Sequence, residues 1–546
     1  MSRFSWSLFP GLVVAGSFLT LAALLLFQLA AYPDSLSLSL GPRFARTLYW
    51  TTVQASLSTL LSVLTGILLA WALSHRRRFR GRSVYIALLS SALVLPTLVI
   101  VLGIVSILGR SGWINNALRW MEFSPFDTFI FGLSGIVLAH VYFNASYVAR
   151  TLLGRFESIP IEQHKLGKSL GLSAWQRFKM IELPAISGTL PGLTITIFLL
   201  CFTSFSIVLI LGGSPKYNTL EVSIYEAIKL DFDLGRALGL ALTQLGICAV
   251  LILLGSRLRR DNRLIAAASD KQSPVKESNL LAVVQCLIIL LFGLIFVLPL
   301  LAVITDGMSA NFIKLAGDRN FQIALFTSLS IALLSTLLVL FSSVLFAAAY
   351  ATLATRQRLG GGWLSKPLLK LLSFSSTLYL AVPSLVLGFG FFLLSRSIGG
   401  AQTLWAVIAL LTSNVLMVLP FAVTALAPAM VKSANRYDKL AFSLGLKKWH
   451  RWRLIEANLV KPELIYIASL AFCMSLGDLG VIALFGNQDF ITLPWLLYQK
   501  MGSYRTDEAA GIALIMLALT LAVFLVLPKL FSSARTDARI DHYAKA

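Results

Sequence analysis

The chain contains the stretch KLGKSLGLSAWQRFKMIELP at residues 165–184 and the related stretch KLAFSLGLKKWHRWRLIEAN at residues 439–458. Ten of the twenty aligned positions are identical, and the stretches begin 274 residues apart, about half the length of the 546-residue chain. A repeat at this spacing indicates a duplicated structural unit. Because the repeat is polar and basic in a mostly apolar chain, we interpret each copy as a loop that binds a partner.

Composition indicates an integral membrane protein. Hydrophobic residues make up 57% of the chain and charged residues only 13%, whereas soluble domains carry about 25% charged residues. The net charge of +22 would also fit a nucleic-acid-binding protein, but the basic residues occur in short clusters between apolar runs. We therefore expect a lipid bilayer and no nucleic acid as partner. The cysteines and histidines show no metal-binding spacing, so no metal site is predicted.

Twelve apolar runs are long enough to cross a membrane, which takes about 20 residues in a helix. They are centred near residues 21, 60, 96, 139, 203, 246, 291, 337, 382, 414, 474 and 520. The first run, from about Phe9 to Ala31, is too long for a signal-peptide core and is expected to be retained. The predicted fold class is an all-α integral membrane protein with about twelve transmembrane helices.

Lys and Arg cluster after every even-numbered span. Five arginines between residues 76 and 82 follow the second span, and four between residues 257 and 263 follow the sixth. Two of the alternate loops carry acidic residues instead, among them Glu221 and Asp507. The positive-inside rule therefore predicts that both termini and both repeated loops are cytoplasmic. Six spans per unit give both repeats the same orientation, so they are parallel repeats.

The repeat divides the chain into two predicted halves. The first comprises residues 1–262, with its loop at about 151–190, and the second comprises 280–546, with its loop at about 428–462. A polar cytoplasmic linker, 263–279, is predicted to join them.

Each repeated loop is predicted to form two short helices joined at a glycine, Gly171 or Gly445, because glycine tolerates left-handed backbone geometry. In the first copy Leu183-Pro184 is predicted to end the second helix. Such a helix–turn–helix can insert into a groove on a partner. The alternative is that the tryptophans of the two loops are only interfacial anchors and the basic residues only follow the positive-inside rule.

The loops resemble the coupling loop, or EAA loop, of bacterial ABC importer permeases. That pattern reads E-A-A, three residues, Gly, nine residues, Ile, one residue, Leu-Pro, and the first copy matches it from Gly171 to Pro184. The departures are Lys-Leu-Gly at residues 165–167 in place of E-A-A, and Ala457-Asn458 in place of Leu-Pro in the second copy. The resemblance implies that an ATPase contacts Glu162, Gln163, Gly171, Trp175, Arg177, Leu183, Pro184, Asp438, Gly445, Trp449 and Arg451.

Longer segments resemble the fused permeases of the iron/sulfate/thiamine type, and most closely those of thiamine and thiamine-pyrophosphate importers. They include GIVSILGRSGW at 103–113, SFSIVLILGG at 204–213 and SLGDLGVIALFGN at 475–487. The resemblance implies the type I ABC importer permease fold, the bacterial inner membrane, a homodimeric ATP-binding subunit at the two loops and a periplasmic thiamine-binding protein. The sequence has no phosphate-binding GxxxxGK[ST] loop, so we expect ATP-Mg on the partner ATPase, and neither a cofactor nor enzyme activity on this chain.

Two other functions stay open at this point. One is a ferric-ion permease of the same fused family. The other is a proton-coupled secondary transporter in which Asp478 and His140 relay protons.

Asp478 is the clearest acidic residue within a predicted span. A charge at membrane depth costs roughly 2.5–3.5 kcal/mol on insertion scales, so such a residue usually faces a polar cavity. We therefore predict that Asp478 contacts a cation such as the thiazolium of thiamine, the alternative being a structural hydrogen bond. The weaker candidates for the substrate pathway, for which packing is the alternative, are His140, Tyr142, Tyr147, Phe205 and Tyr225.

Pro96 and Pro383 lie at equivalent places within predicted spans. Proline kinks a helix because it removes a hydrogen bond, so both are predicted kinks, either for gating or for shape alone.

Overall fold

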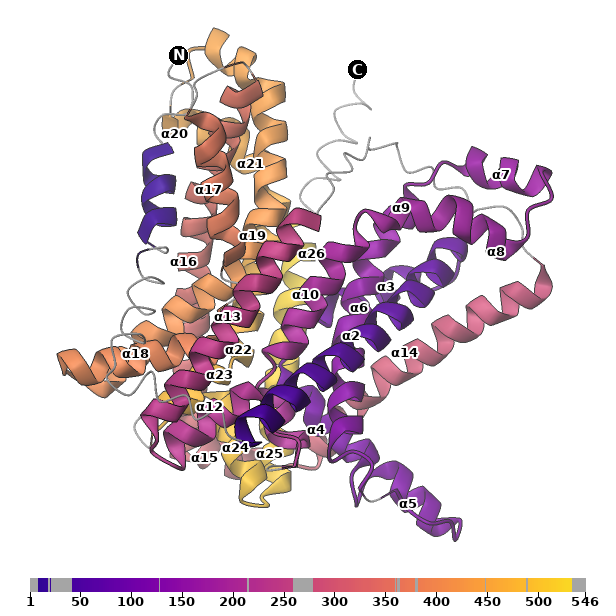
Figure 1. Ribbon diagram of the computed structural model, residues 1–546. Coiled ribbons are helices and arrows are strands. Elements are labelled where there is room, and N and C mark those ends of the chain that lie inside the picture. The colour runs from indigo at the N-terminus through magenta and orange to yellow at the C-terminus, as the bar shows by residue number, and fades with distance from the viewer. Residues whose placement is uncertain are drawn as a thin grey trace. The chain divides into compact units, whose positions relative to one another are not determined.

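The computed structural model describes residues 8–17, 20, 42–126, 128–213, 216–258, 278–358, 360, 364–378, 382–446, 448–487 and 490–532. Figure 1 shows a chain built from helices, and none of these described residues forms a β-strand. The predicted all-α class is therefore confirmed. The described residues exclude most of the first predicted span and nearly all of the linker, 263–279.

Eight described helices are long and apolar enough to cross a membrane. They are Pro42–His75, Thr97–Trp120, Leu234–Gly255, Asn279–Met308, Arg319–Arg358, Gln402–Asp438, Lys461–Phe485 and Thr506–Lys529. Ala174–Ser187 and Leu190–Phe202, which meet at a bend of 66°, are together also long and apolar enough to cross a membrane and would make a ninth span. These helices include the predicted centres near residues 60, 246, 291, 337, 414, 474 and 520.

The described helices belong to two compact units. The first, here the α2 unit, comprises Ser39–Ile224 and Gly246–Ala310. Its helices are α2 (Pro42–His75), α3 (Arg82–Ser91), α4 (Thr97–Leu108), α5 (Trp113–Trp120), α6 (Leu133–Glu157), α7 (Ile161–Ser169), α8 (Ala174–Arg177), α9 (Leu183–Ser187), α10 (Leu190–Phe202), α11 (Ser206–Leu211) and α14 (Asn279–Met308). Helices α12 (Leu220–Lys229) and α13 (Leu234–Leu258) each contribute residues to both units.

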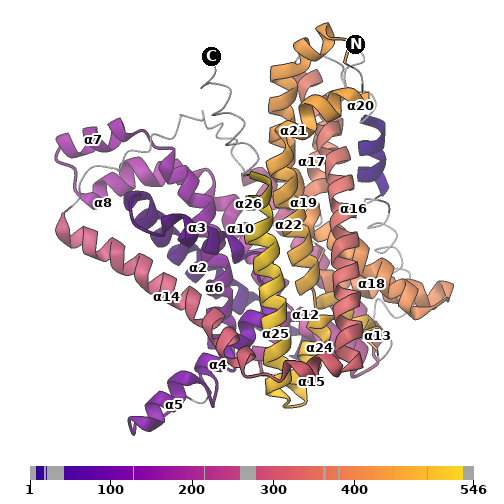
Figure 2. The ribbon, with the colours of Figure 1, turned by 180° about the vertical axis from the view of Figure 1, so that it is seen from behind.

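The second unit, here the α16 unit, comprises Met1–Leu38, Tyr225–Leu245 and Asn311–Ala546. Its helices are α15 (Phe312–Gly317), α16 (Arg319–Arg358), α17 (Ser365–Leu378), α18 (Ser384–Ile398), α19 (Gln402–Ser443), α20 (Lys448–Arg451), α21 (Ala457–Leu459), α22 (Lys461–Gly477), α23 (Gly480–Phe485), α24 (Leu493–Gly502), α25 (Thr506–Leu521) and α26 (Leu527–Ser532). Figure 2 shows α25 and α26 running beside α22, with which both are in contact.

The α2 unit includes a helix from beyond the linker. Helix α14 packs on α4 and α2, and a Cβ on Gly103 would lie only 2.3 Å from the carbonyl oxygen of Pro299. Tyr142 also donates a hydrogen bond of 3.0 Å to the carbonyl of Phe296. The absence of a side chain at Gly103 thus permits close packing of α4 on α14.

The α16 unit includes the N-terminal helix Leu8–Ser17 in the same way. A Cβ on Gly11 would lie 2.4 Å from the carbonyl oxygen of Leu345, so this helix packs tightly on α16. Each unit therefore contains an apolar helix from the start of the other sequence half. The predicted halves describe the sequence repeat, whereas the compact units are defined by contacts.

The repeat is visible in the buried polar contacts of the two units. In the α2 unit, the ring Nδ1 of His140 on α6 lies 3.0 Å from the Ser58 hydroxyl on α2. In the α16 unit, Asn414 on α19 donates a hydrogen bond of 3.3 Å to the Ser335 hydroxyl on α16. The long helix pairs α2–α6 and α16–α19 are thus joined by equivalent polar contacts.

Candidate functional site

The first repeated loop is a helix–turn–helix. Helix α7 begins after Pro160, and Gly171 follows it with φ +71°, in the left-handed region. Ser173 then caps α8, since its hydroxyl accepts from the Gln176 N–H while the Gln176 side chain accepts from the Ser173 N–H. This capping box fixes the start of the second helix. The predicted left-handed glycine turn is confirmed here.

The second repeated loop has the same turn on a longer helix. Helix α19 runs without interruption to Ser443, and Gly445 adopts φ +64°. In the first loop, by contrast, a break at Ser158–Pro160 separates α6 from α7. The two copies therefore share the turn but differ in the element that leads to it.

Both loops continue through a π-helical turn, at Phe178–Glu182 in the first copy and Trp452–Glu456 in the second. The prediction that Leu183-Pro184 ends the helix is wrong, because Pro184 lies in the first turn of α9, where its missing N–H does not disrupt the helix. The chain instead bends by 66° between Ser187 and Leu190. Since the second copy has Asn458 where the first has Pro184, proline is not the cause of the π turn.

A buried ion cluster stabilises the second loop. Arg451 Nε lies 2.7 Å from Glu456 Oε1, and another guanidinium nitrogen lies 2.5 Å from Asp438 Oδ1. The three side chains are 12% exposed or less. Burial, together with the nearby Asp438, raises the pKa of Glu456 above its ordinary value, although the adjacent Arg451 lowers it. The cluster ties the end of α19 to the π turn.

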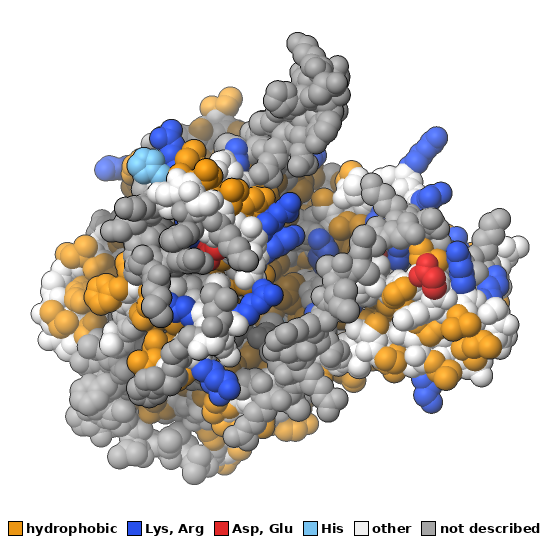
Figure 3. Space-filling view, turned by 90° about the horizontal axis from the view of Figure 1, so that it is seen from above, with side chains coloured by type: hydrophobic (Ala, Val, Ile, Leu, Met, Phe, Trp, Pro, Cys, Tyr) orange, Lys and Arg blue, Asp and Glu red, His pale blue; other side chains and the backbone are white. Residues whose placement is uncertain are grey.

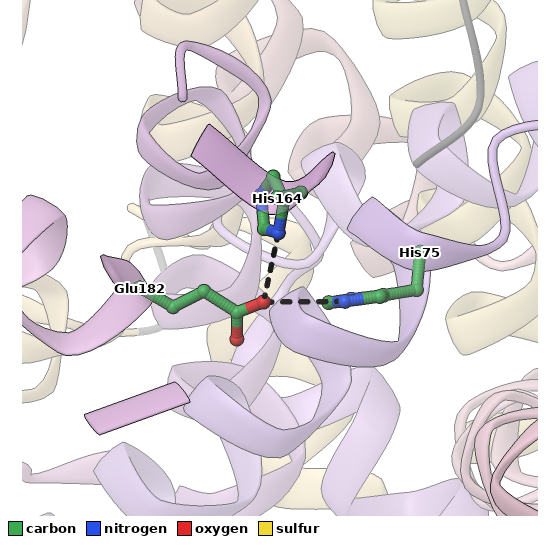
Figure 4. Close-up of side chains that lie close together, drawn as sticks. All are labelled: His75, His164 and Glu182. Carbon is green, nitrogen blue, oxygen red and sulfur yellow. Dashed lines mark ion pairs between the residues drawn. The ribbon is translucent and has the colours of Figure 1, made fainter. Parts of the chain in front are cut away.

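The first loop has different side chains at the same place, shown in Figure 4. Glu182 corresponds to Glu456, and His164 stands where the second loop has Asp438, each 274 residues earlier. Glu182 Oε1 lies 3.2 Å from His75 Nε2 and 3.7 Å from His164 Nδ1. Burial lowers the pKa of His164, and the nearby carboxylate of Glu182 opposes this effect only in part. Arg177, the counterpart of Arg451, donates to the Leu172 carbonyl at 2.8 Å.

The two loops expose apolar side chains at equivalent positions. Six such side chains are between 51% and 67% exposed, and each in the first loop has its counterpart 274 residues later. They are Leu166, Leu170 and Met180 in the first loop, and Leu440, Leu444 and Leu454 in the second. Exposed apolar side chains rimmed by polar residues are typical of a protein-interaction surface.

The α2 unit has basic side chains around its loop, including the exposed Lys165, Lys168 and Lys179 neighbours of these apolar residues. Figure 3 looks onto this end of the chain, where blue Lys and Arg side chains are frequent and red acidic ones sparse. A partner surface that fits here needs apolar pockets and acidic groups.

The other predicted loop residues fall into two groups. Glu162, Gln163 and Trp175 are exposed, Trp175 by 70%, and they can reach a partner. Arg177 and Arg451 are 8% and 6% exposed, so they support the loop from within. Pro184 is exposed and Leu183 partly buried. The side chain of Trp449 lies outside the described residues.

Asp478 lies at a break between two helices. It follows α22 and precedes α23, and the corresponding residue in the α2 unit, Ser204, lies in the equivalent break between α10 and α11. Asp478 Oδ1 accepts a hydrogen bond of 3.1 Å from the Gly480 N–H. Its Oδ2 is buried and has no hydrogen-bond partner among the described residues. Broken helices with such polar ends line the binding sites of many transporters.

The remaining pathway candidates do not form one described site. His140, Tyr142, Tyr147 and Phe205 belong to the α2 unit, and Tyr225 belongs to the α16 unit. Of these, Tyr142 lines a largely apolar cavity of about 920 Å³ within the α2 unit. His140 and Phe205 are buried among packed helices.

Pro96 and Pro383 are not inside helices. Pro96 is the residue before α4 and Pro383 the residue before α18. They mark helix starts, where proline fits without loss of a hydrogen bond. Their role in gating stays a prediction.

Comparison with known proteins identifies the family. Residues 62–264, which include the first loop, match the family described as "Binding-protein-dependent transport system inner membrane component". The chain is 39% identical over 487 residues to the thiamine transport system permease protein ThiP of Escherichia coli K12, covering 87% of each chain. The chain belongs to the ThiP permease family.

Other ThiP proteins cover more of the chain. The Brucella abortus (strain 2308) protein is 38% identical over 90% of this chain and 88% of its own. The Salmonella typhimurium LT2 protein is 37% identical over 97% of this chain and 98% of its own. The ThiP family assignment confirms the resemblance recognised from the repeated loops, and with it the type I permease fold and a multi-pass inner-membrane location.

Some features of this ThiP family member could not be read from the sequence pattern. The π turns have no sequence signature of their own, although both fall at the same distance after the loop glycine. The contact of His75 with the first loop joins residues more than 80 positions apart. A comparison of the two copies shows His164 in place of Asp438, which indicates that the surroundings of Glu182 differ from those of Glu456 but does not point to His75.

Proposed function

We propose that this chain is the permease of an importer that carries thiamine and its phosphates, including thiamine pyrophosphate, across the inner membrane. The support comes from the ThiP proteins, named as thiamine transport permeases, which are 37–39% identical to this chain over up to 97% of its length. A homodimeric ATP-binding subunit, which binds ATP-Mg, docks at the two loops. A periplasmic thiamine-binding protein delivers the substrate.

The observation that carries the ATPase contact is the matched exposure of the two loops. Because the same three positions are apolar and exposed in both copies, two identical partner surfaces can bind them, one at each loop. A homodimer supplies such a pair of surfaces. The left-handed glycine turn holds these positions on two short helices, which suits insertion into a groove.

The loops are joined to the helices that break near Asp478 and Ser204. The first π turn leads through α9 and the 66° bend into α10, and the second leads through α21 into α22. Helices α10 and α22 each end at the break, so a movement of the loop is transmitted to the break through these segments. The buried ion pairs of Arg451 with Asp438 and Glu456 stiffen the second loop, so that it can move as one rigid piece.

The polar chemistry near Asp478 favours an organic cation over a ferric ion. Asp478 offers one unpartnered carboxylate oxygen, which suits a single positive charge such as the thiazolium of thiamine. A hard trivalent ion requires several oxygen ligands. In the described part of the chain, the group with metal-ligand spacing lies beside the first loop and consists of two histidines and one glutamate.

Uptake in a strain that lacks thiamine synthesis tests the proposal. Cells with this chain, its ATPase and its binding protein should grow on trace thiamine and take up labelled thiamine, and cells without the chain should not. Asp478→Asn should reduce uptake severalfold with normal membrane levels and normal ATPase co-purification. Asp507→Asn, at an exposed position, is the matched control and should transport normally.

Two results would change the assignment. Growth on limiting iron with no effect on thiamine uptake would support the ferric-ion alternative. Thiamine uptake that persists without any ATPase and collapses with the proton gradient would support the secondary transporter.

A further inference from the structure

Three side chains from three separate elements meet beside the first loop. His75 is the last residue of α2, His164 lies on α7, and Glu182 is the last residue of the π turn. Their ligand atoms lie within 4.8 Å of one another, and Figure 4 shows both imidazoles directed at one carboxylate oxygen. The side chains are 8% exposed or less, so the cluster is shielded from bulk water.

The hydrogen bonds of His75 leave the lone pair of its Nε2 directed at the Oε1 of Glu182. Its Nδ1 lies 3.0 Å from the carbonyl oxygen of Trp71 and 3.3 Å from the Ser74 hydroxyl. Because Ser74 donates its own proton to the Trp71 carbonyl at 2.8 Å, the tautomer that fits these contacts carries its proton on Nδ1. In neutral imidazole the other nitrogen, Nε2, is then an acceptor. Yet Nε2 lies 3.2 Å from Glu182 Oε1, which is also an acceptor. Two acceptors at this distance repel each other unless a cation lies between them.

Glu182 supplies the second observation. It is 2% exposed, and its Oε2 has no hydrogen-bond partner among the described residues. The equivalent Glu456 is neutralised by Arg451 at 2.7 Å. The ion pairs found for Glu182 in the described chain involve only the two histidines. The guanidinium groups of Arg177 and Arg77 are close enough to act on His164. A cation in direct contact with Glu182 would compensate its buried charge more fully, and an uncompensated buried charge is costly.

We propose that His75, His164 and Glu182 bind a divalent transition-metal ion, Zn²⁺, at the base of the first loop. Zinc bonds of about 2.0–2.2 Å in tetrahedral geometry separate neighbouring ligand atoms by about 3.3–3.6 Å. The two distances to Glu182 Oε1 are 3.2 Å and 3.7 Å, and the two imidazole nitrogens lie within 4.8 Å of each other. Two histidines and one glutamate are an established zinc ligand set with a fourth position open to water. The bond from His75 to the Trp71 carbonyl is the outer contact that orients a zinc-bound histidine.

The site would join α2 to the loop in the α2 unit only. In the α16 unit the position of His164 is taken by Asp438, which pairs with Arg451. The first loop is thereby stabilised by a metal ion that can dissociate, whereas the second is stabilised by the guanidinium group of Arg451, which is part of the chain. Occupancy by zinc would make the stiffness of one coupling element depend on metal supply. This proposal is independent of the transported substrate.

Zinc titration of the purified full-length permease tests the site. The protein, stripped with a chelator and carrying no polyhistidine tag, should bind one Zn²⁺ per chain, and Co²⁺ in its place should give the visible absorption of a tetrahedral site. His75→Gln, His164→Gln and Glu182→Gln should each weaken binding by about tenfold or more. His450→Gln removes an exposed histidine from the second loop and should leave binding unchanged.

A second measurement does not depend on variants. X-ray absorption at the zinc edge of the loaded wild-type protein should show two imidazole ligands. Failure of the wild-type chain to bind zinc, equal weakening by His450→Gln, or a zinc edge without imidazole would overturn the proposal. In that case the charge of Glu182 is balanced without a metal ion, and the proposal of thiamine transport still stands.

Discussion

At the scale of single residues, the glycine turns are the feature that sequence reasoning predicted best. The repeat showed a glycine at the same place in both loops, and the structure gives Gly171 φ +71° and Gly445 φ +64°. A Cβ at either position meets nothing within 4 Å, so backbone conformation alone explains the need for glycine there. The His75 contact with Glu182 could not be predicted, because nothing in local pattern says which distant helix end meets the loop.

Gly171→Val should therefore disturb the first loop through strain alone. A β-branched residue at positive φ costs about 1–3 kcal/mol, so the turn should rearrange and the ATPase should co-purify severalfold less well. Gly171→Asn should behave nearly like the wild type, because asparagine tolerates this conformation. Co-purification from membranes with equal permease levels measures the difference.

The control for this experiment is Gly154→Val. Gly154 lies on α6 with an ordinary helical φ, and a Cβ added there would meet nothing within 4 Å. If Gly154→Val and Gly171→Val reduce the amount of co-purified ATPase equally, or if neither reduces it, the glycine turn does not position the loop for contact with the ATPase.

At the scale of elements, the two loops illustrate how one sequence pattern gives two modes of support. Both have a π turn at equivalent positions, but a continuous α19 leads into the second loop, whereas the first follows a break after α6. Sequence periodicity identified helices and the turn between them. Sequence periodicity could not place the π turns, because the position of a π turn in a helix depends on tertiary packing as much as on local sequence preference.

Arg451→Met should destabilise the second loop strongly. It would leave the carboxylates of Asp438 and Glu456 buried and unpaired, which costs about 3–5 kcal/mol for a broken buried ion pair. We expect a lower thermal unfolding temperature in lipid nanodiscs and a loss of ATPase binding at this loop. Arg453→Met, two residues away and exposed, should change the unfolding temperature little. Similar unfolding temperatures for the two variants would contradict the structural role of the cluster.

At the scale of the whole molecule, apolar runs predicted the helices and basic clusters predicted their orientation. Seven predicted span centres lie inside the eight described helices that are long and apolar enough to cross a membrane. The exchange of helices between sequence halves was not predictable. Hydropathy says which segments are apolar, but the partner of α14 depends on close approaches such as that of Gly103 to Pro299.

Single-cysteine labelling tests the predicted orientation. In a chain without its four native cysteines, a cysteine at Asn218 should react with an impermeant reagent added to the periplasm. A cysteine at Ser273, which lies in the linker outside the described residues, should react only after the inner membrane is opened. The reverse pattern would place the repeated loops in the periplasm and remove the basis for ATPase docking.

The position of α14 in the α2 unit also has a consequence for biosynthesis. The α2 unit is incomplete until residues 279–308 have left the ribosome, because α14 covers α4 and α2. The surface of α4 at Gly103, on which Pro299 packs, therefore has no partner while the linker is still being translated. Because the two halves are fused, α14 reaches the membrane on the same nascent chain and at the same translocon. The time during which α4 and α2 lack this helix is therefore shorter than if α14 had to arrive by diffusion from a separately made subunit.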